Sequence, residues 1–299
     1  MKPETGPAVA ILIDGELAPG QSSASFVVPW WSFTKTVLAT AALRLVEQGE
    51  LTLDEPLLEQ RYTLRQLLKH TSGLRNYTQL TAYEPAVRSG DAPWPGDEML
   101  DRVAAELPPF EPRTRWAYSN TGYYIVRRCI ERVVDCALGE ALDRLVFSPL
   151  GISGPFVAAT PHDLDSCAWG NPTRYHPQWV YHGLLVGSAE AAARALYGIV
   201  SGKILSDSLI SEMLRPIPLG EEIPGRPGRQ FGYGMAMMIA LQSPAGGFYG
   251  HTGHDWTSVA AVYHFPDLKP ARTVAAFLPG DREAEVEWVA VNTACAVNP

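Results

Sequence analysis

The placement of strand-like segments at the two ends of the sequence, with helical patterns between them, constrains the fold more than any other feature. Apolar runs rich in β-branched residues and bounded by turn-forming Gly, Pro or Asp predict strands. The C-terminal runs follow one another through short turns, which favours an antiparallel meander over parallel strands joined by helices. The predicted strands are 8–14 and 26–31 near the start, and 233–241, 258–265 and 272–278 near the end.

Helical periodicity dominates the rest of the chain. Apolar residues recur at helical spacing after residue 32, and Gly49 marks the end of that segment. We expect helices at 32–48, 63–69, 122–134, 189–200, 207–214 and 283–296.

These patterns predict an α/β (α+β) fold, with one antiparallel β-sheet built from both termini and flanked by helices. We expect residues 1–60 and 185–299 to form the sheet lobe, and residues 61–184 to form an inserted, mainly helical lobe. A binding site would then lie in the cleft between the two lobes.

Composition excludes several classes of function. The net charge is −8, and the 5 Lys and 19 Arg form no basic stripe of the kind that binds nucleic acid. No apolar run approaches the roughly 20 residues that cross a bilayer. Neither the four Cys nor the seven His have the spacing of a metal site, so no metal or other cofactor is expected.

The first seven residues are polar and contain two prolines, unlike a signal peptide. They predict a cytoplasmic protein, although a periplasmic chain trimmed of its signal peptide would have the same sequence. The oligomeric state does not follow from the sequence.

A serine and a lysine stand three residues apart at the start of the first predicted helix, in Ser32-Phe33-Thr34-Lys35. Residues i and i+3 share a helix face, so the amine would lie one turn from the hydroxyl. A helix N-terminus favours an oxyanion, and a buried lysine can lose its proton and act as a base. The alternative is a helix-capping serine followed by a surface lysine, and the pair alone does not decide between them.

Two further short motifs carry groups suited to acyl transfer. Tyr118 and Asn120 lie on a predicted loop, where a phenol can transfer a proton and an amide can bind a carbonyl. His251-Thr252-Gly253 lies at a predicted strand, and Gly253 would let a substrate backbone approach that strand. The first two motifs alone are weak signals because each occurs by chance at an appreciable rate, whereas all three together do not.

The three motifs, Ser-x-x-Lys, Tyr-x-Asn and His-Thr-Gly, resemble the signature of the penicillin-recognising serine hydrolases, the serine β-lactamase-like family. The middle motif resembles the class C β-lactamase branch, which also holds DD-peptidases, D-amino-acid peptidases and carboxylesterases. Other segments are similar to the family in the same order along the chain: 45–54, 63–74, 149–151 and 183–190.

The resemblance implies roles for individual residues. Ser32 would be the nucleophile, and Lys35 and Tyr118 would share its deprotonation and the protonation of the leaving group. Asn120 would hold the acyl side chain, and the backbone N–H groups of Ser32 and His254 would form the oxyanion hole. The fold would be β-lactamase/transpeptidase-like.

Two departures from the family pattern bear on substrate and fold. His251, with Thr252 and Gly253 in a substrate-binding strand, stands where β-lactamases and DD-peptidases usually carry Lys. A histidine is mostly neutral near pH 7, so it binds a substrate carboxylate less well and favours esters or amides that lack one. The segment before Ser32 is also short for the family, which predicts a reduced strand. His70 matches a position that is structural in the family.

The favoured hypothesis is therefore a hydrolase that cleaves ester or amide bonds of small acyl substrates through an acyl-enzyme at Ser32. A true β-lactamase or D-amino-acid peptidase, acting on a lactam or peptide, is the alternative within the family. A catalytically weak binding or scaffold protein is the alternative from another class, and the intact Ser32, Lys35 and Tyr118 argue against it. Trp30, Trp31 and Trp256 could line an acyl pocket or belong to the core.

Overall fold

The computed structural model describes residues 6–57 and 61–296. The predicted lobe boundary at residue 60 and most of the N-terminal segment interpreted above lie outside these residues.

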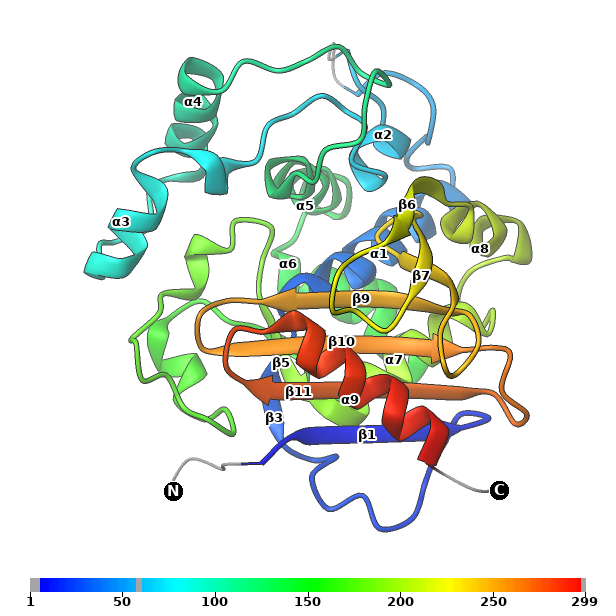
Figure 1. The fold of residues 1–299 in the computed structure, drawn as a ribbon. Helices are drawn as coiled ribbons and strands as arrows, with labels where there is room; N and C mark the ends of the chain where they lie inside the picture. The colour runs from blue at the N-terminus through cyan, green and yellow to red at the C-terminus, as the bar shows by residue number, and fades with distance from the viewer. Residues whose placement is uncertain (1–5, 58–60, 297–299) are drawn as a thin grey trace.

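An eight-stranded antiparallel sheet lies at the centre of the structure, in the order β2-β1-β11-β10-β9-β8-β7-β6 (Figure 1). The first long strand pairs with the last along its whole length, Ala8 opposite Phe277 and Ile13 opposite Arg272. The sheet is thus built from both ends of the chain, as predicted. Its strands are β1 (Ala8–Ile13), β2 (Glu16–Leu17), β6 (Ile217–Glu222), β7 (Arg229–Tyr233), β8 (Met238–Gln242), β9 (Phe248–His254), β10 (Ser258–Phe265) and β11 (Arg272–Pro279).

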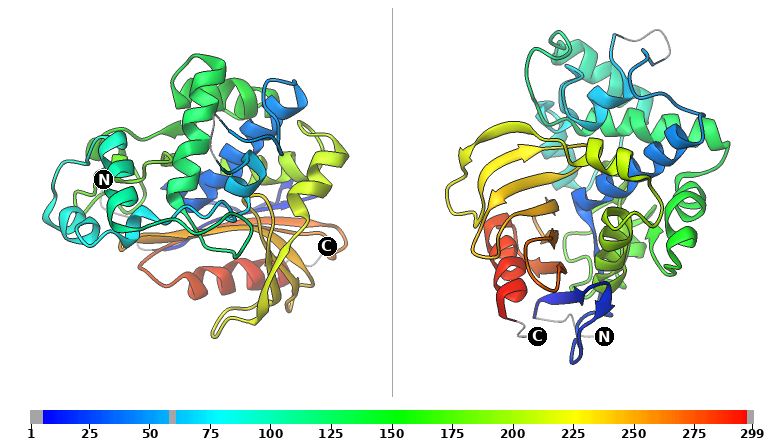
Figure 2. Two further views of the ribbon diagram at one scale, coloured as in Figure 1. Left: turned by 90° about the horizontal axis from the view of Figure 1, so that it is seen from above. Right: turned by 90° about the vertical axis from the view of Figure 1, so that its right-hand side faces the viewer.

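Helices cover both faces of this sheet, as the side view in Figure 2 shows. Helix α9 (Glu283–Ala296) packs on β10 and β11 from one side, and α7 (Ala189–Val200) packs on β1 and β11 from the other. Every residue of β10 is buried, because water reaches neither face of this strand. A strand covered on both faces is continuously apolar rather than alternating, which explains the run from Val259 to Val262.

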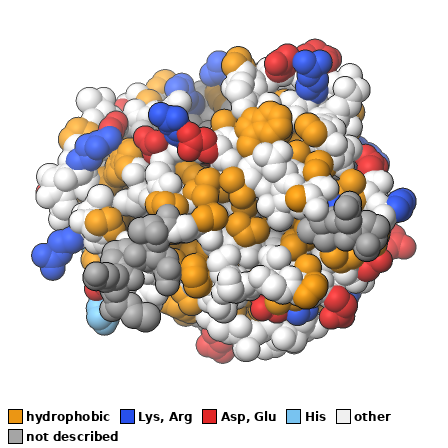
Figure 3. Space-filling view, turned by 60° about the horizontal axis from the view of Figure 1, so that its bottom comes forward, with side chains coloured by type: hydrophobic (Ala, Val, Ile, Leu, Met, Phe, Trp, Pro, Cys, Tyr) orange, Lys and Arg blue, Asp and Glu red, His pale blue; other side chains and the backbone are white. Residues whose placement is uncertain are grey.

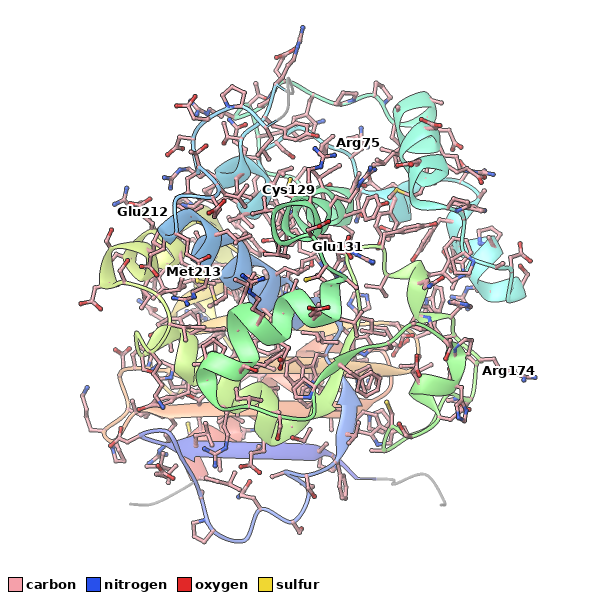
Figure 4. All side chains as sticks on the ribbon, turned by 180° about the vertical axis from the view of Figure 1, so that it is seen from behind. Arg75, Cys129, Glu131, Arg174, Glu212 and Met213 are labelled. Atoms are coloured by element: carbon pink, nitrogen blue, oxygen red, sulfur yellow. The ribbon has the colours of Figure 1, made fainter. Side chains whose placement is uncertain are left out.

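The remaining helices lie behind and above the sheet in Figure 1. Helix α1 packs against α5, and Thr63 begins α2 with a capping box completed by Gln66. In Figure 4, Glu212 and Met213 mark α8, and the Glu212 carboxylate accepts a hydrogen bond from Arg65 of α2 at 2.6 Å. These helices are α1 (Thr34–Glu47), α2 (Leu64–Leu68), α3 (Tyr83–Ser89), α4 (Gly96–Glu106), α5 (Asn120–Val134), α6 (Leu138–Leu142) and α8 (Asp207–Leu214), with short turns η1 (Trp31–Phe33), η2 (Tyr77–Gln79), η3 (Asp143–Phe147), η4 (Ser148–Leu150), η5 (Pro161–Leu164) and η6 (Pro177–Trp179).

A second, three-stranded sheet, in the order β3-β5-β4, was not predicted. The expectation of a single sheet containing residues 26–31 is wrong, because β3 (Val27–Pro29) pairs with β5 (Leu185–Ser188) and not with β1. Strand β4 (Phe156–Val157) completes this sheet. An apolar pattern identifies a strand but not its partner, and here the partner lies more than 150 residues away.

Two predictions near the C-terminus are also wrong. The expected strand 233–241 is two strands, β7 and β8, joined by a turn in which Gly234 N–H donates to Met237 O at 2.8 Å. This turn is buried and apolar, through Met235, Ala236 and Met237, so the sequence contains no polar turn signal there. The expected loop 215–229 contains β6, an edge strand that tolerates proline.

The segment before the nucleophile motif contains a reduced strand, as expected, since β2 has only two residues. Within the described parts of the chain, no helix has both the length and the apolarity needed to cross a membrane. On the face drawn in Figure 3, acidic and basic side chains are scattered among apolar ones.

Candidate active site

Ser32 lies in the single turn η1 that leads into α1, and not at the N-cap of that helix as expected. The preceding residue, Trp31, has a φ of 45°, a left-handed conformation that is rare for a bulky side chain. Its indole N–H donates to Ser258 Oγ of β10 at 2.8 Å, and its ring packs edge-on against Tyr175. These contacts hold the strained turn that presents the Ser32 hydroxyl.

Lys35 lies three residues after Ser32, on α1, and its side chain contacts the Ser32 hydroxyl. Lys35 Nζ lies 2.8 Å from Ser32 Oγ, and the lysine is fully buried. Burial holds the pKa of the amine well below its ordinary value, although the charge of Glu283 opposes the shift. The neutral amine has a free lone pair, which can accept the serine proton.

The phenol of Tyr118 approaches the same oxygen from the other side. Tyr118 Oη donates to Ser32 Oγ at 3.0 Å. The loop that carries it is held by Ser119, which caps α5 by accepting from Gly122 N–H, and by Ala117 N–H, which donates to His70 O. Burial raises the pKa of the Tyr118 phenol, and the hydrogen bond to Ser32 opposes the shift, so the phenol keeps its proton at neutral pH.

The third motif lies on β9, directly against the turn that contains Ser32. A Cβ added to Gly253 would lie 2.4 Å from Ser32 N and 2.6 Å from Trp31 Cβ, closer than real contacts allow. Only glycine fits here, because the strand passes alongside the nucleophile. The backbone of the neighbouring residues Thr252 and His254 is thereby brought next to Ser32.

His251 belongs to a chain of hydrogen bonds with a single direction. Ser119 N–H donates to His70 Nδ1 at 3.1 Å, so His70 carries its proton on Nε2 and donates to Tyr233 Oη at 3.1 Å. The Tyr233 hydroxyl then donates to His251 Nε2 at 2.9 Å, and His251 Nδ1–H donates to Thr252 O. Burial lowers the pKa of His251 to about 3, so this imidazole is neutral.

The site also contains residues that the motifs did not reveal. His182 Nε2 lies 3.1 Å from Lys35 Nζ, and Glu283 accepts from Arg226 at 2.6 Å and faces His254 Nδ1 at 3.2 Å. Although burial opposes it, His254 and Arg226 lower the pKa of Glu283 to about 2. Arg226 and His182 lie in loops and Glu283 begins helix α9, and none of the three belongs to a motif, so the sequence gave no signal for them.

A cavity of about 510 Å³ lies above Ser32. Six of the eight predicted site residues line it: Ser32, Tyr118, Asn120, His251, Thr252 and His254. Lys35 lies beneath Ser32, and Gly253 is buried against the turn. Trp31 and Trp256 belong to the aromatic lining, whereas Trp30 packs in the core against Phe33 and Phe147.

Comparison with known proteins agrees with this arrangement. The sequence model of the β-lactamase family matches residues 4–285. Esterase EstB from Burkholderia gladioli is 29% identical over 286 aligned positions, which cover 74% of this chain and 72% of the esterase. Penicillin-binding protein 4* from Bacillus subtilis is 27% identical over 154 positions, 46% of this chain and 33% of that protein.

Solved structures share the fold along nearly the whole chain. The D-amino acid amidase from Ochrobactrum anthropi SV3, complexed with D-phenylalanine, superposes with a TM-score of 0.82 at 18% identity, covering 99% of this chain and 95% of the amidase. The penicillin binding protein from Bacillus halodurans superposes with a TM-score of 0.75 at 18% identity, covering 97% and 96%. At such identities the likeness establishes a common fold.

The close approach of β9 to Ser32 predicts the effect of Gly253→Ala. The added methyl group must displace either the strand or the nucleophile turn, so we expect labelling of Ser32 by a fluorophosphonate probe to slow about 100-fold or more in a folded protein. Gly139→Ala in α6 is the matched control, because its Cβ would meet nothing closer than 3.9 Å. Labelling of Gly253→Ala at the wild-type rate would contradict the geometry.

Proposed function

Since the chain belongs to the β-lactamase family of serine hydrolases, we propose that it cleaves ester or amide bonds of small acyl substrates through an acyl-enzyme at Ser32. One observation supports this proposal most directly. The buried amine of Lys35 and the buried phenol of Tyr118 both lie within 3.0 Å of Ser32 Oγ, at the floor of a cavity.

Acylation follows from the protonation states of these groups. The Ser32 proton moves to the Lys35 lone pair while Oγ bonds to the substrate carbonyl carbon. The backbone N–H groups of Ser32 and His254 hold the oxyanion. The Tyr118 phenol then gives its proton to the leaving alkoxide or amine, which departs and leaves a phenolate beside the new ammonium group.

Deacylation reverses these transfers. Water attacks the acyl carbonyl and gives a proton to the Tyr118 phenolate, and the departing Ser32 Oγ takes back the proton held by Lys35. Each group returns to its starting state, so neither a His–Asp pair nor a metal enters the cycle. The buried Oδ1 of Asn120 has no hydrogen-bond partner among the described residues, so it can accept an N–H of the acyl group, and the Asn120 NH2 group can donate to a carbonyl.

The neutral His251 supports a substrate without a carboxylate. Its Nε2 accepts from Tyr233 and its Nδ1 donates to the backbone, so it offers no cation to an incoming anion. The aromatic part of the cavity lining, which includes Trp31, Tyr83 and Tyr175, suits an apolar acyl group. A lactam or a D-amino-acid substrate is the alternative. It is supported by the names of the D-amino acid amidase and of the penicillin-binding protein that this chain is similar to.

Substrate choice can be tested with p-nitrophenyl acetate and butyrate against a chromogenic cephalosporin. We expect turnover of the esters and slower turnover of the cephalosporin, and Ser32→Ala should abolish both. Lys35→Ala and Tyr118→Phe should each lower kcat about 100-fold or more, because each removes a proton-transfer group. Tyr197→Phe, a change on α7 outside the cavity, is the matched control.

Three results would contradict this assignment. Cephalosporin hydrolysis as fast as ester hydrolysis would favour the β-lactamase alternative. Near-normal rates in Lys35→Ala or Tyr118→Phe would show that the proton-transfer roles are wrong, and no turnover of any ester, amide or lactam would favour a binding protein.

The third motif predicts a change in selectivity for His251→Lys. A lysine there introduces a cation at the cavity wall, so the ratio of kcat/KM for mono-p-nitrophenyl succinate to that for p-nitrophenyl butyrate should rise about tenfold. His176→Lys, which adds the same charge outside the cavity, should leave the ratio unchanged. An unchanged ratio in His251→Lys would show that residue 251 does not face the acyl group.

A further inference from the structure

The imidazole of His182 is a second hydrogen-bond partner of the reactive amine, besides Ser32. His182 lies just before β5 and is 2% exposed, and its Nε2 lies 3.1 Å from Lys35 Nζ. The amine therefore lies between two partners, the Ser32 hydroxyl at 2.8 Å and this imidazole. No motif in the sequence marks His182, and the mechanism above assigns it no role.

We propose that His182 is a positioning residue of the acylation step, which accepts an N–H of Lys35 at Nε2 and thereby turns the amine lone pair toward Ser32. This inference rests on the proposed function, because it concerns the same proton transfer.

The argument follows from the number of hydrogen-bonding groups on the amine. A neutral amine has one lone pair and two N–H groups. If His182 Nε2 carried a proton, it would compete with the Ser32 hydroxyl for that single lone pair. If Nε2 is the acceptor, one amine N–H is directed to His182 and the lone pair stays available to Ser32.

The same arrangement suits the lysine after it has taken the serine proton. An ammonium group can only donate, so His182 Nε2 must then be an acceptor. Burial, together with nearby positive charge, keeps the pKa of His182 well below its ordinary value, so the imidazole stays neutral and able to accept. One tautomer, with the proton on Nδ1, therefore serves both halves of the reaction.

No other neutral imidazole replaces His182 in this role. His70 and His251 are both engaged with Tyr233, and their remaining ring nitrogens pair with the backbone. His182 Nδ1, in contrast, has no hydrogen-bond partner among the described residues. The Lys35 amine is thus the hydrogen-bond partner of this imidazole among the described residues.

The groups that set the charge state of Lys35 come from several elements. The electric field of these groups at Lys35 is unchanged when the neutral His182 is replaced by another neutral side chain. A change in the pKa of Lys35 in such a variant therefore reports the lost contact with His182. Apart from Ser32 and His182, they are Tyr118 before α5, Tyr123 on α5, His70 after α2, His251 on β9 and Glu283 on α9, and Arg127 on α5 also faces His182.

The experiment measures the rate of fluorophosphonate labelling of Ser32 against pH, which isolates the first proton transfer from turnover. Losing an acceptor from the ammonium form lowers the pKa of Lys35. In His182→Leu we therefore expect the acid limb of the profile to move down by roughly one to two pH units, and the plateau rate to fall roughly tenfold because the amine is misoriented. His182→Gln, whose amide oxygen can accept, should restore the limb toward its wild-type position.

His264→Leu is the matched control, since His264 is also buried but pairs with Thr273 on the far part of the sheet. It should lower stability without moving the limb. An unmoved limb in His182→Leu, whatever the drop in rate, would overturn the role of His182. Failure of the wild type to label at Ser32 at any pH would instead overturn the proposed function.

Discussion

The removal of the Lys35 amine from water is the interaction on which the site depends. Desolvation favours the neutral amine, and only a neutral amine can take the Ser32 proton. Burial of this group requires elements far apart in sequence to close around it: the turn at Ser32, the loop at Tyr118, the strand β9 and the segment that contains His182. The antiparallel sheet and its two helical layers hold these segments in contact.

The same desolvation keeps the three imidazoles around Lys35, those of His70, His182 and His251, neutral. A charged imidazole beside Lys35 would be repelled by the ammonium that forms during acylation, whereas a neutral one can accept a hydrogen bond. His70, Tyr233 and His251 form a directed chain in which every proton has an assigned position. His251 is thus neutral and bonded to Tyr233, so it contributes no cation to the cavity wall.

Sequence reasoning predicted the fold class and the Ser32–Lys35 pair from local spacing, whereas Tyr118 came from a family motif; the structure brings these three side chains together. Ser32 and Lys35 are one helical turn apart, and the long apolar runs near the C-terminus mark buried strands. Sequence reasoning did not predict features that depend on tertiary contacts. These are the apolar turn between β7 and β8, the pairing of β3 with β5, and the contact of His182 with Lys35. A histidine in a loop has no periodicity, so only the folded chain shows its partner.

The charge state of Lys35 can be measured directly. The chain has only five lysines, so ¹⁵N-lysine labelling followed by NMR titration of the side-chain amines gives a small set of signals, and Lys35→Ala assigns the one in the site. The account predicts one amine that titrates well below the ordinary lysine pKa of about 10.4 and is missing in Lys35→Ala. Five lysines that all titrate near the ordinary value would contradict it.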